Sequence, residues 1–129
     1  DFSSNSTVFE ADLLVTDWSG IAYEYAFTTN KPVLFVDTPM KVMNPEYQKI
    51  DTVPINIWMR DVIGDRLDPA KAEETEEKVR NLLEQKDAYQ EKIQKFVEEY
   101  VYNLGHSAEV GAKYIVQVVQ EKIKKANEQ

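Results

Sequence analysis

Short apolar runs and a helical pattern alternate in the first third of the chain. Residues 12–16 form a nearly continuous apolar run, which is typical of a strand covered on both faces. Apolar residues then recur at helical spacing from 21 to 26, and Asn30 and Lys31 are expected to end this helix. A second apolar run follows over residues 32–37. This succession predicts a βαβ unit whose two strands are parallel.

The middle of the chain is less regular. Residues 38–47 contain two prolines and show no clean period, so we predict a long loop there. Residues 54–58 alternate between apolar and polar, which predicts a third, short strand, and residues 62–67 are interpreted as a connector. Ahead of the first strand, Asn5 or Ser6 is expected to cap a short helix.

From Asp68 onward the pattern is helical. Asp68 and Pro69 suit the N-cap and the first position of a helix, where the missing N–H of proline does no harm. Two helices with apolar stripes are expected before Gly105, and the glutamate-rich residues 73–77 are interpreted as a solvated face. Ser107 is predicted to cap a last helix. Its expected inward face consists of Ala108, Ala112, Ile115, Val116, Val119 and Ile123.

These patterns predict one α/β domain over residues 1–129, with a βαβ-containing part at 1–67 and a helical part at 68–129. A chain of 129 residues fits a single domain of ordinary size. Its 43% apolar residues are enough for one core, and seven Tyr, five Phe and two Trp argue against disorder.

Charge and composition exclude several classes of protein and site. The net charge of −8 argues against a nucleic-acid partner and against a patch that binds anionic membranes. The absence of cysteine excludes disulfides, thiolate metal sites and a cysteine nucleophile. The single histidine has no zinc-binding spacing around it, so neither a metal nor another cofactor is expected. No apolar run approaches the roughly 20 residues of a membrane-spanning helix.

The turn between the first strand and the following helix is the main candidate for a binding site. It reads Thr16-Asp17-Trp18-Ser19-Gly20 and follows a predicted parallel strand, at the sheet edge where open α/β sheets bind ligands. The first N–H groups of a helix lack partners within the helix, and the helix dipole favours anions. Gly20 lets an anion approach the backbone, and Ser19 adds a hydroxyl. A phosphate or diphosphate fits this pattern, although the same residues also suit an ordinary helix cap worth about 1 kcal/mol.

The stretch from Ala11 to Asp37 resembles the CDP-glycerol:poly(glycerophosphate) glycerophosphotransferase family. That family typically has Asp-x-x-Ile-Thr-Asp-Tyr-Ser-Ser, an aromatic-rich helix, Lys or Arg with Pro, and then a strand. This chain has Thr-Asp-Trp-Ser-Gly, an aromatic-rich helix, and Lys31 with Pro32 before the second run. Trp18 stands for the usual Tyr and Gly20 for the usual second Ser, so one hydroxyl is lost.

The resemblance implies a partial Rossmann-like, three-layer fold with a short parallel sheet and C-terminal helices. The chain would be the C-terminal part of the donor-nucleotide-binding lobe of a GT-B-like enzyme of teichoic acid or related cell-wall polymer synthesis. CDP-glycerol binds this lobe, glycerol phosphate passes to an acceptor hydroxyl held with the missing lobe, and CMP is released. The resemblance also implies a cytoplasmic enzyme, peripheral at the inner face of the membrane.

Site residues follow from the same resemblance. Asp17 should accept hydrogen bonds from a hydroxyl or from N–H groups of its own loop, because a carboxylate should not face a phosphate unscreened. The family's catalytic histidines lie earlier in the chain than this motif, so no residue here is expected to be catalytic and the chain alone is expected to be inactive. His106 is interpreted as a helix-entry or surface residue. The residues expected at the donor's phosphates and glycerol are Thr16, Asp17, Trp18, Ser19 and Gly20, with Asp37 as a weaker candidate.

Two other functions remain open at the level of sequence. The nucleotide-sugar-binding lobe of a GT-B glycosyltransferase shares the strand–turn–helix anion site, and a fold does not fix a function. A preference for cytidine over uridine nucleotides would distinguish the two. A non-catalytic α/β phosphate-binding module, such as a receiver domain, belongs to a different class. The region around Asp1 offers no strand with the acidic pair that a receiver needs, and Asp17 unmodified by acetyl phosphate and Mg²⁺ would exclude it.

Overall fold

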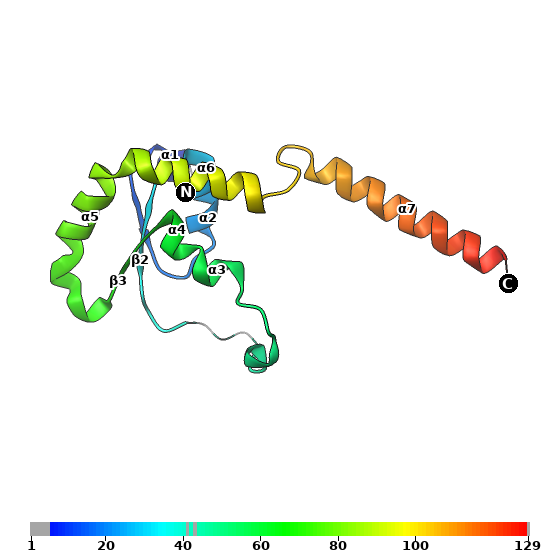
Figure 1. Cartoon of the computed structure of the whole chain (residues 1–129), viewed down its shortest axis with the longest axis horizontal. Coiled ribbons are helices and arrows are strands. Elements are labelled where there is room, and N and C mark those ends of the chain that lie inside the picture. Colours follow the sequence, from blue (N-terminus) through cyan, green and yellow to red (C-terminus); the bar gives the residue numbers. More distant parts are fainter. Residues whose placement is uncertain (1–5, 41, 43, 129) are drawn as a thin grey trace. The chain divides into compact units, whose positions relative to one another are not determined.

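A three-stranded parallel sheet lies at the centre of the first part of the chain (Figure 1). The computed structural model describes residues 6–40, 42 and 44–128. The strands lie in the order β1 (Leu14–Thr16), β2 (Val33–Val36) and β3 (Gly64–Leu67). The predicted βαβ unit is confirmed: α2 connects β1 to β2, and the two strands pair in parallel.

Helices account for most of the remaining chain. The α-helices are α1 (Ser6–Glu10), α2 (Ile21–Thr29), α3 (Ile55–Trp58), α4 (Arg60–Ile63), α5 (Thr75–Glu84), α6 (Lys86–Tyr100) and α7 (Ser107–Asn127). Two 3₁₀ helices are η1 (Tyr47–Lys49) and η2 (Pro69–Glu74). The chain separates into two compact units, Asp1–Val97 and Glu98–Gln129.

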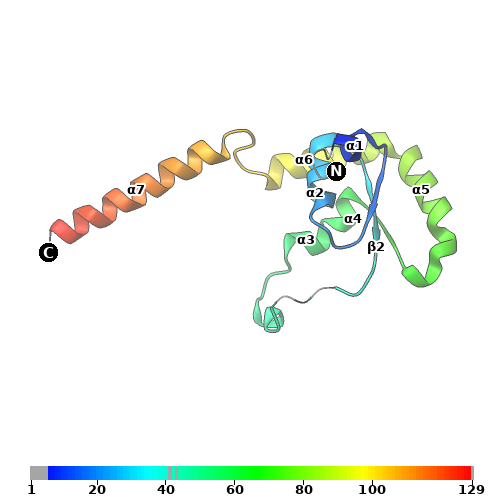
Figure 2. The same cartoon turned by 180° about the vertical axis from the view of Figure 1, so that it is seen from behind.

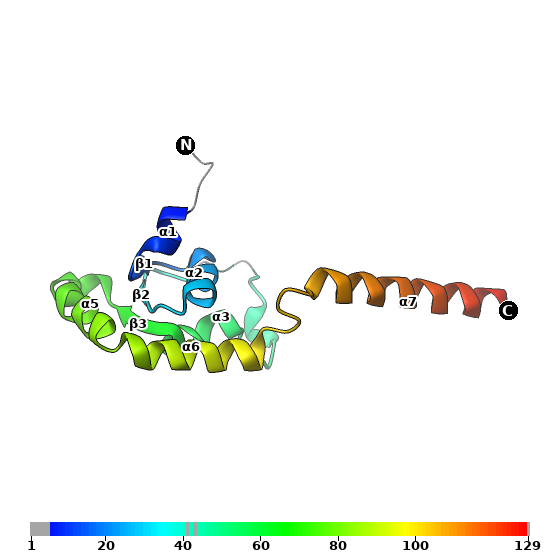
Figure 3. The same ribbon diagram turned by 90° about the horizontal axis from the view of Figure 1, so that it is seen from above.

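Alternation along β2 divides the core of the first unit into two clusters. Val33 and Phe35 point to one face of the sheet, where they pack with buried residues of α2, α4 and α6. Leu34 points to the other face and packs with Leu67 and with Leu82 of α5. Figures 1 and 2 show α5 on one side of the sheet and α2 and α4 on the other, and Figure 3 shows the same layers from above. The predicted three-layer α/β fold with a short parallel sheet is therefore confirmed.

Two sequence-based assignments in the middle of the chain are wrong. Residues 54–58 form no strand: after Pro54 the chain folds into the short helix α3. The third strand is β3, within the segment 62–67 that was interpreted as a connector. The polar residues Asp65 and Arg66 interrupt the apolar pattern by which a strand is recognised in a sequence. In the structure, both side chains form ion pairs. Such a strand forms its backbone hydrogen bonds with β2 although its sequence does not alternate between apolar and polar residues.

Gly64 explains why β3 begins where it does. It lies opposite Val33 of β2, and a Cβ at this position would stand 1.8 Å from the Val33 carbonyl oxygen. Only glycine lets the two backbones approach so closely, which is one of the uses of glycine inside a strand.

Several predicted helix ends are confirmed. Asn30 follows α2 in the left-handed conformation (φ 55°), and its N–H donates to the Ala26 carbonyl at 2.8 Å. Asp68 accepts a hydrogen bond from the Ala70 N–H at 2.9 Å, with Pro69 at the first helical position. The helix that follows starts as the 3₁₀ segment η2 before it becomes α5. Helix α1 begins at Ser6, while Asn5 lies outside the described residues.

The second unit contains α7, and the expected inward face of this helix is exposed. The helix itself is predicted correctly, but His106 rather than Ser107 is at its N-cap, and the Ser107 hydroxyl donates to the Asn103 carbonyl. The large apolar side chains of the expected face are uncovered: Ile115 64%, Val116 54%, Val119 49% and Ile123 56% exposed. An amphipathic pattern identifies the apolar face of a helix, but it does not show which surface packs against that face. Within the described residues, no helix has the length and apolarity needed to cross a membrane.

Candidate functional site

The turn after β1 lies at the carboxyl edge of the sheet, as predicted. Thr16 ends β1, and the register pairs it with Phe35 of β2. Asp37 follows the last residue of β2, and its N–H donates to the Leu67 carbonyl at the end of β3. The candidate residues therefore meet at one edge, where a parallel sheet offers its ligand site.

At the tip of α2, backbone N–H groups are left without an acceptor among the described residues. Gly20 is the N-cap residue and has no side-chain cap. The Ser19 N–H donates to Asp17 Oδ1 at 3.0 Å, as expected for a carboxylate satisfied by its own loop. Among the residues that the structure describes, none accepts a hydrogen bond from the N–H of Gly20 or Ile21. Two such donors, together with the helix dipole, give this tip the chemistry that an anion requires.

There is free space in front of this tip. Ser19 and Gly20 are exposed, and a Cβ built on Gly20 would have no neighbour within 4 Å. The φ of Gly20 is −61°, a value that any residue adopts, so the glycine is not needed for the turn itself. Its small size instead leaves room for a group that approaches from solvent.

Asp37 is held by two arginines. Arg66 donates from Nε to Asp37 Oδ2 at 2.8 Å, and this hydrogen bond raises the pKa of Arg66 above its ordinary value. Arg60 Nη2 lies 2.8 Å from Asp37 Oδ1, which makes an ion pair although the two groups are not aligned for a hydrogen bond. Arg60 is only 1% exposed, so its charge depends on this carboxylate. Asp37 thus reaches the predicted edge, but both of its oxygens are already engaged.

Arg60 also supports the turn. Its guanidinium carbon lies 3.8 Å from the centre of the Trp18 ring and 4.7 Å from that of Phe35. The Trp18 indole N–H donates to the Thr38 carbonyl at 2.8 Å. A desolvated cation–π contact is worth about 2 kcal/mol. Trp18 is therefore a fixed wall of the site, held both by the buried arginine and by the segment after β2.

Sequence reasoning missed Arg60. The residue starts α4, and it lies between the two segments, 54–58 and 62–67, whose assignments are wrong. A signal was available, because Arg60 stands among Trp58, Met59, Val62 and Ile63. An arginine among so many apolar neighbours is buried only when an acidic partner is near.

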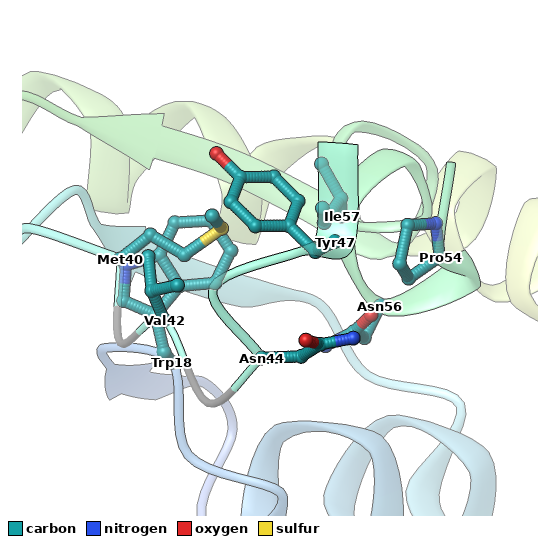
Figure 4. A pocket seen from close by; sticks show the side chains of 8 residues that line it. All are labelled: Trp18, Met40, Val42, Asn44, Tyr47, Pro54, Asn56 and Ile57. Atoms are coloured by element: carbon teal, nitrogen blue, oxygen red, sulfur yellow. The ribbon is translucent and has the colours of Figure 1, made fainter. Parts of the chain in front are cut away.

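A pocket of about 420 Å³ opens beside Trp18 (Figure 4). One wall is tied to the first turn of α2, since the Tyr23 hydroxyl donates to the Asn56 carbonyl at 3.1 Å. Burial raises the pKa of the Tyr23 hydroxyl, while the charge of Arg60 acts in the opposite direction. The lining residues are Trp18, Met40, Val42, Asn44, Tyr47, Pro54, Asn56 and Ile57. The pocket and the helix tip thus share Trp18 and are linked a second time through Tyr23.

Comparison with known families identifies the class of protein. The sequence profile of the CDP-Glycerol:Poly(glycerophosphate) glycerophosphotransferase family matches residues 1–119. The chain belongs to this family. Membership assigns it to the transferases of the glycerophosphotransferase type, whose family name implies a CDP-glycerol donor and a polymer acceptor. No curated protein and no solved structure matches the chain.

Proposed function

We propose that this chain is the donor-binding part of a transferase that moves glycerol phosphate from CDP-glycerol to a hydroxyl of a cell-wall or surface polymer. The observation that carries the proposal is the open tip of α2, whose Gly20 and Ile21 N–H groups have no acceptor among the described residues. The family match supplies the class of donor. Residues 1–67 provide the strand ends and the tip, and residues 68–129 the helical part of the same lobe.

The site residues have distinct proposed roles. The diphosphate lies against the N–H groups of Gly20 and Ile21 and accepts a hydrogen bond from the Ser19 hydroxyl, with Thr16 at the base of the turn. Asp17 accepts a hydrogen bond from the Ser19 N–H with one carboxylate oxygen, and its second oxygen accepts one from a glycerol hydroxyl. Asp37 does not contact the donor itself but positions Arg60 against the Trp18 ring.

The reaction is a simple displacement at phosphorus. The acceptor oxygen bonds to the phosphorus that carries glycerol, the bond from that phosphorus to CMP breaks, and CMP leaves with the electron pair. The proton of the acceptor hydroxyl goes to a base, which we place on a histidine outside these 129 residues. The tip stabilises the negative charge of the non-bridging oxygens and the charge that the bridging oxygen gains as CMP leaves, as oriented N–H donors do for phosphates elsewhere. The whole enzyme is proposed to act at the inner face of the membrane.

Amide chemical shifts test the location and the preference of the site. We expect titration with CDP to shift the resonances of residues 17–21 first and most strongly. CDP and CMP should bind more tightly than UDP. A preference for UDP would favour a sugar-nucleotide glycosyltransferase instead, and shifts centred away from residues 17–21 would refute the placement.

Substitutions at the tip provide the first mutational prediction. Ser19→Ala should weaken CDP binding about fivefold, because a hydrogen bond is worth about 1 kcal/mol. Gly20→Val should weaken it more, at least about tenfold, since its side chain fills the space in front of the free N–H groups. The structure accommodates a Cβ at Gly20, so the variant should still fold, with at most the modest loss of stability of a poorer N-cap residue. Titration calorimetry gives the affinities.

Gly111→Val is the matched control. A Cβ at Gly111 also has no neighbour within 4 Å, but this glycine lies in α7, which belongs to the second unit. CDP affinity should therefore equal that of the unmodified chain. Unchanged affinity in both Ser19→Ala and Gly20→Val would remove the helix tip from the proposal.

A further inference from the structure

The pocket beside Trp18 has no charged lining residue among those that the structure describes. Aromatic and aliphatic side chains make most of its surface, and two asparagines add amide groups. The lining that the structure describes offers no positive charge to a phosphate or an anionic polymer, which would lose hydration there. A neutral group that is flat, apolar on its faces and polar at its edge fits better.

The polar groups of the pocket are available at its surface. Asn44 Oδ1 accepts from the Glu46 N–H at 3.0 Å, which leaves its Nδ2 as a donor. The Asn56 side chain has no hydrogen bond to any described residue, while its main-chain carbonyl accepts a hydrogen bond from the Tyr23 hydroxyl. Figure 4 shows the Tyr47 ring and the two amides bordering the same space. An apolar pocket with a few such groups is the usual form of a small-molecule site, and about 420 Å³ lies within the usual size range.

We infer that this pocket binds the nucleobase of the donor. The inference rests on the proposed function, because it takes the ligand to be a nucleotide whose phosphates lie at the tip of α2. The base stacks against the aromatic wall formed by Trp18 and Tyr47, and amides of Asn44 and Asn56 bond to its edge. Trp18 and the Tyr23–Asn56 hydrogen bond place the pocket next to the tip, so one nucleotide spans both.

Binding of two ligands that differ only by the base tests the inference. Cytidine 5′-monophosphate and ribose 5-phosphate carry the same phosphate and sugar, and both are titrated into the 129-residue chain. We expect the cytidine nucleotide to bind about tenfold more tightly, because stacking of a base on an aromatic side chain typically contributes that much. Both ligands should shift the amide of Gly20, whereas only the nucleotide should shift the indole N–H of Trp18.

Tyr47→Ala should remove most of this difference. The backbone bonds of Tyr47 stay, since its N–H and carbonyl, not its ring, hold η1. We expect the variant to bind the cytidine nucleotide about tenfold more weakly and ribose 5-phosphate with unchanged affinity. Asn56→Ala is a second variant, expected to weaken nucleotide binding about threefold. Tyr114→Ala is the control, because Tyr114 is a 66% exposed tyrosine of α7, and it should change neither affinity.

The outcomes separate the two proposals. Equal binding of both ligands to the unmodified chain, with Gly20 shifted in each case, would overturn the nucleobase site and leave the phosphate site intact. A loss of affinity for both ligands in Tyr47→Ala would also overturn it, since the ring would then support the phosphate site only. If neither ligand binds, the proposed function fails and this inference fails with it.

Discussion

At the scale of single residues, Asp37 determines how the site is held together. Its two oxygens face two arginines, one of which is fully buried and lies against Trp18. A buried guanidinium without a counter-ion is costly, whereas an exposed ion pair contributes little. Loss of the Asp37 carboxylate should therefore reduce the free energy of unfolding mainly through Arg60 and only slightly through Arg66.

We predict that Asp37→Asn lowers the free energy of unfolding by about 3 kcal/mol, because it leaves Arg60 charged and unpaired in the core. Arg60→Met should cost less, since Asp37 keeps Arg66 as a partner and is partly exposed. Urea unfolding followed by circular dichroism measures both. Glu76→Gln is the control: its pair with Arg80 is exposed on both sides and should contribute less than about 0.5 kcal/mol. Equal effects of Asp37→Asn and Glu76→Gln would contradict the burial argument.

Sequence predicted the positions of the turn residues but not what surrounds them. Thr16 and Gly20 lie at the end of a strand and at the start of a helix because an apolar run and a helical period meet there. Asp17 bonds within its own loop, as electrostatics required. Arg60 is 23 positions beyond Asp37 in the chain, and only the tertiary fold brings it under Trp18. Local patterns do not contain that information.

At the scale of elements, β3 shows where periodicity fails. Its pairing is set by backbone contact with β2 at Gly64 and by ion pairs of Asp65 and Arg66 rather than by an apolar run. Pattern reasoning therefore assigned the third strand to residues 54–58, where the chain instead turns into α3 after Pro54. The long, strongly periodic helices were placed correctly because their signal extends over several turns.

Gly64→Ala should destabilise the fold by about 3 kcal/mol or more, because its Cβ would collide with the Val33 carbonyl, which belongs to a buried strand and cannot move aside. Thermal unfolding measures the effect. Gly111→Ala is the matched control. It replaces a glycine inside α7, where the new Cβ meets nothing within 4 Å, and should leave the unfolding midpoint unchanged or slightly higher. A silent Gly64→Ala would show that β2 and β3 are not in the register described.

At the scale of the whole molecule, the two units differ in how they are stabilised. The first unit has a sheet covered on both faces and two clusters of buried residues. The large apolar residues of α7 in the second unit remain exposed. The sequence predicted an apolar face on α7 but assigned this face to the core. Periodicity identifies an apolar face of a helix, but it does not identify what packs against that face.

Amide hydrogen exchange should separate the two units. We expect the amides of β2 to exchange only through global unfolding, since these residues are buried in a paired strand. Amides of α7 should exchange orders of magnitude faster, because its large apolar residues are exposed and a helix without a buried face is marginal in water. Mass spectrometry after pepsin digestion resolves the two segments. Equal protection of α7 and β2 would mean that the exposed face is covered in solution.

The hydrogen bond from Trp18 to the Thr38 carbonyl joins two loops that follow different strands. A ligand that immobilises the first loop also restrains the second, from which the pocket wall begins at Met40. The conformational entropy that these loops lose when one half of a nucleotide binds is then not lost again when the other half binds. Phosphate and base would thus bind cooperatively through this shared hydrogen bond, and each would raise the affinity for the other by the same factor.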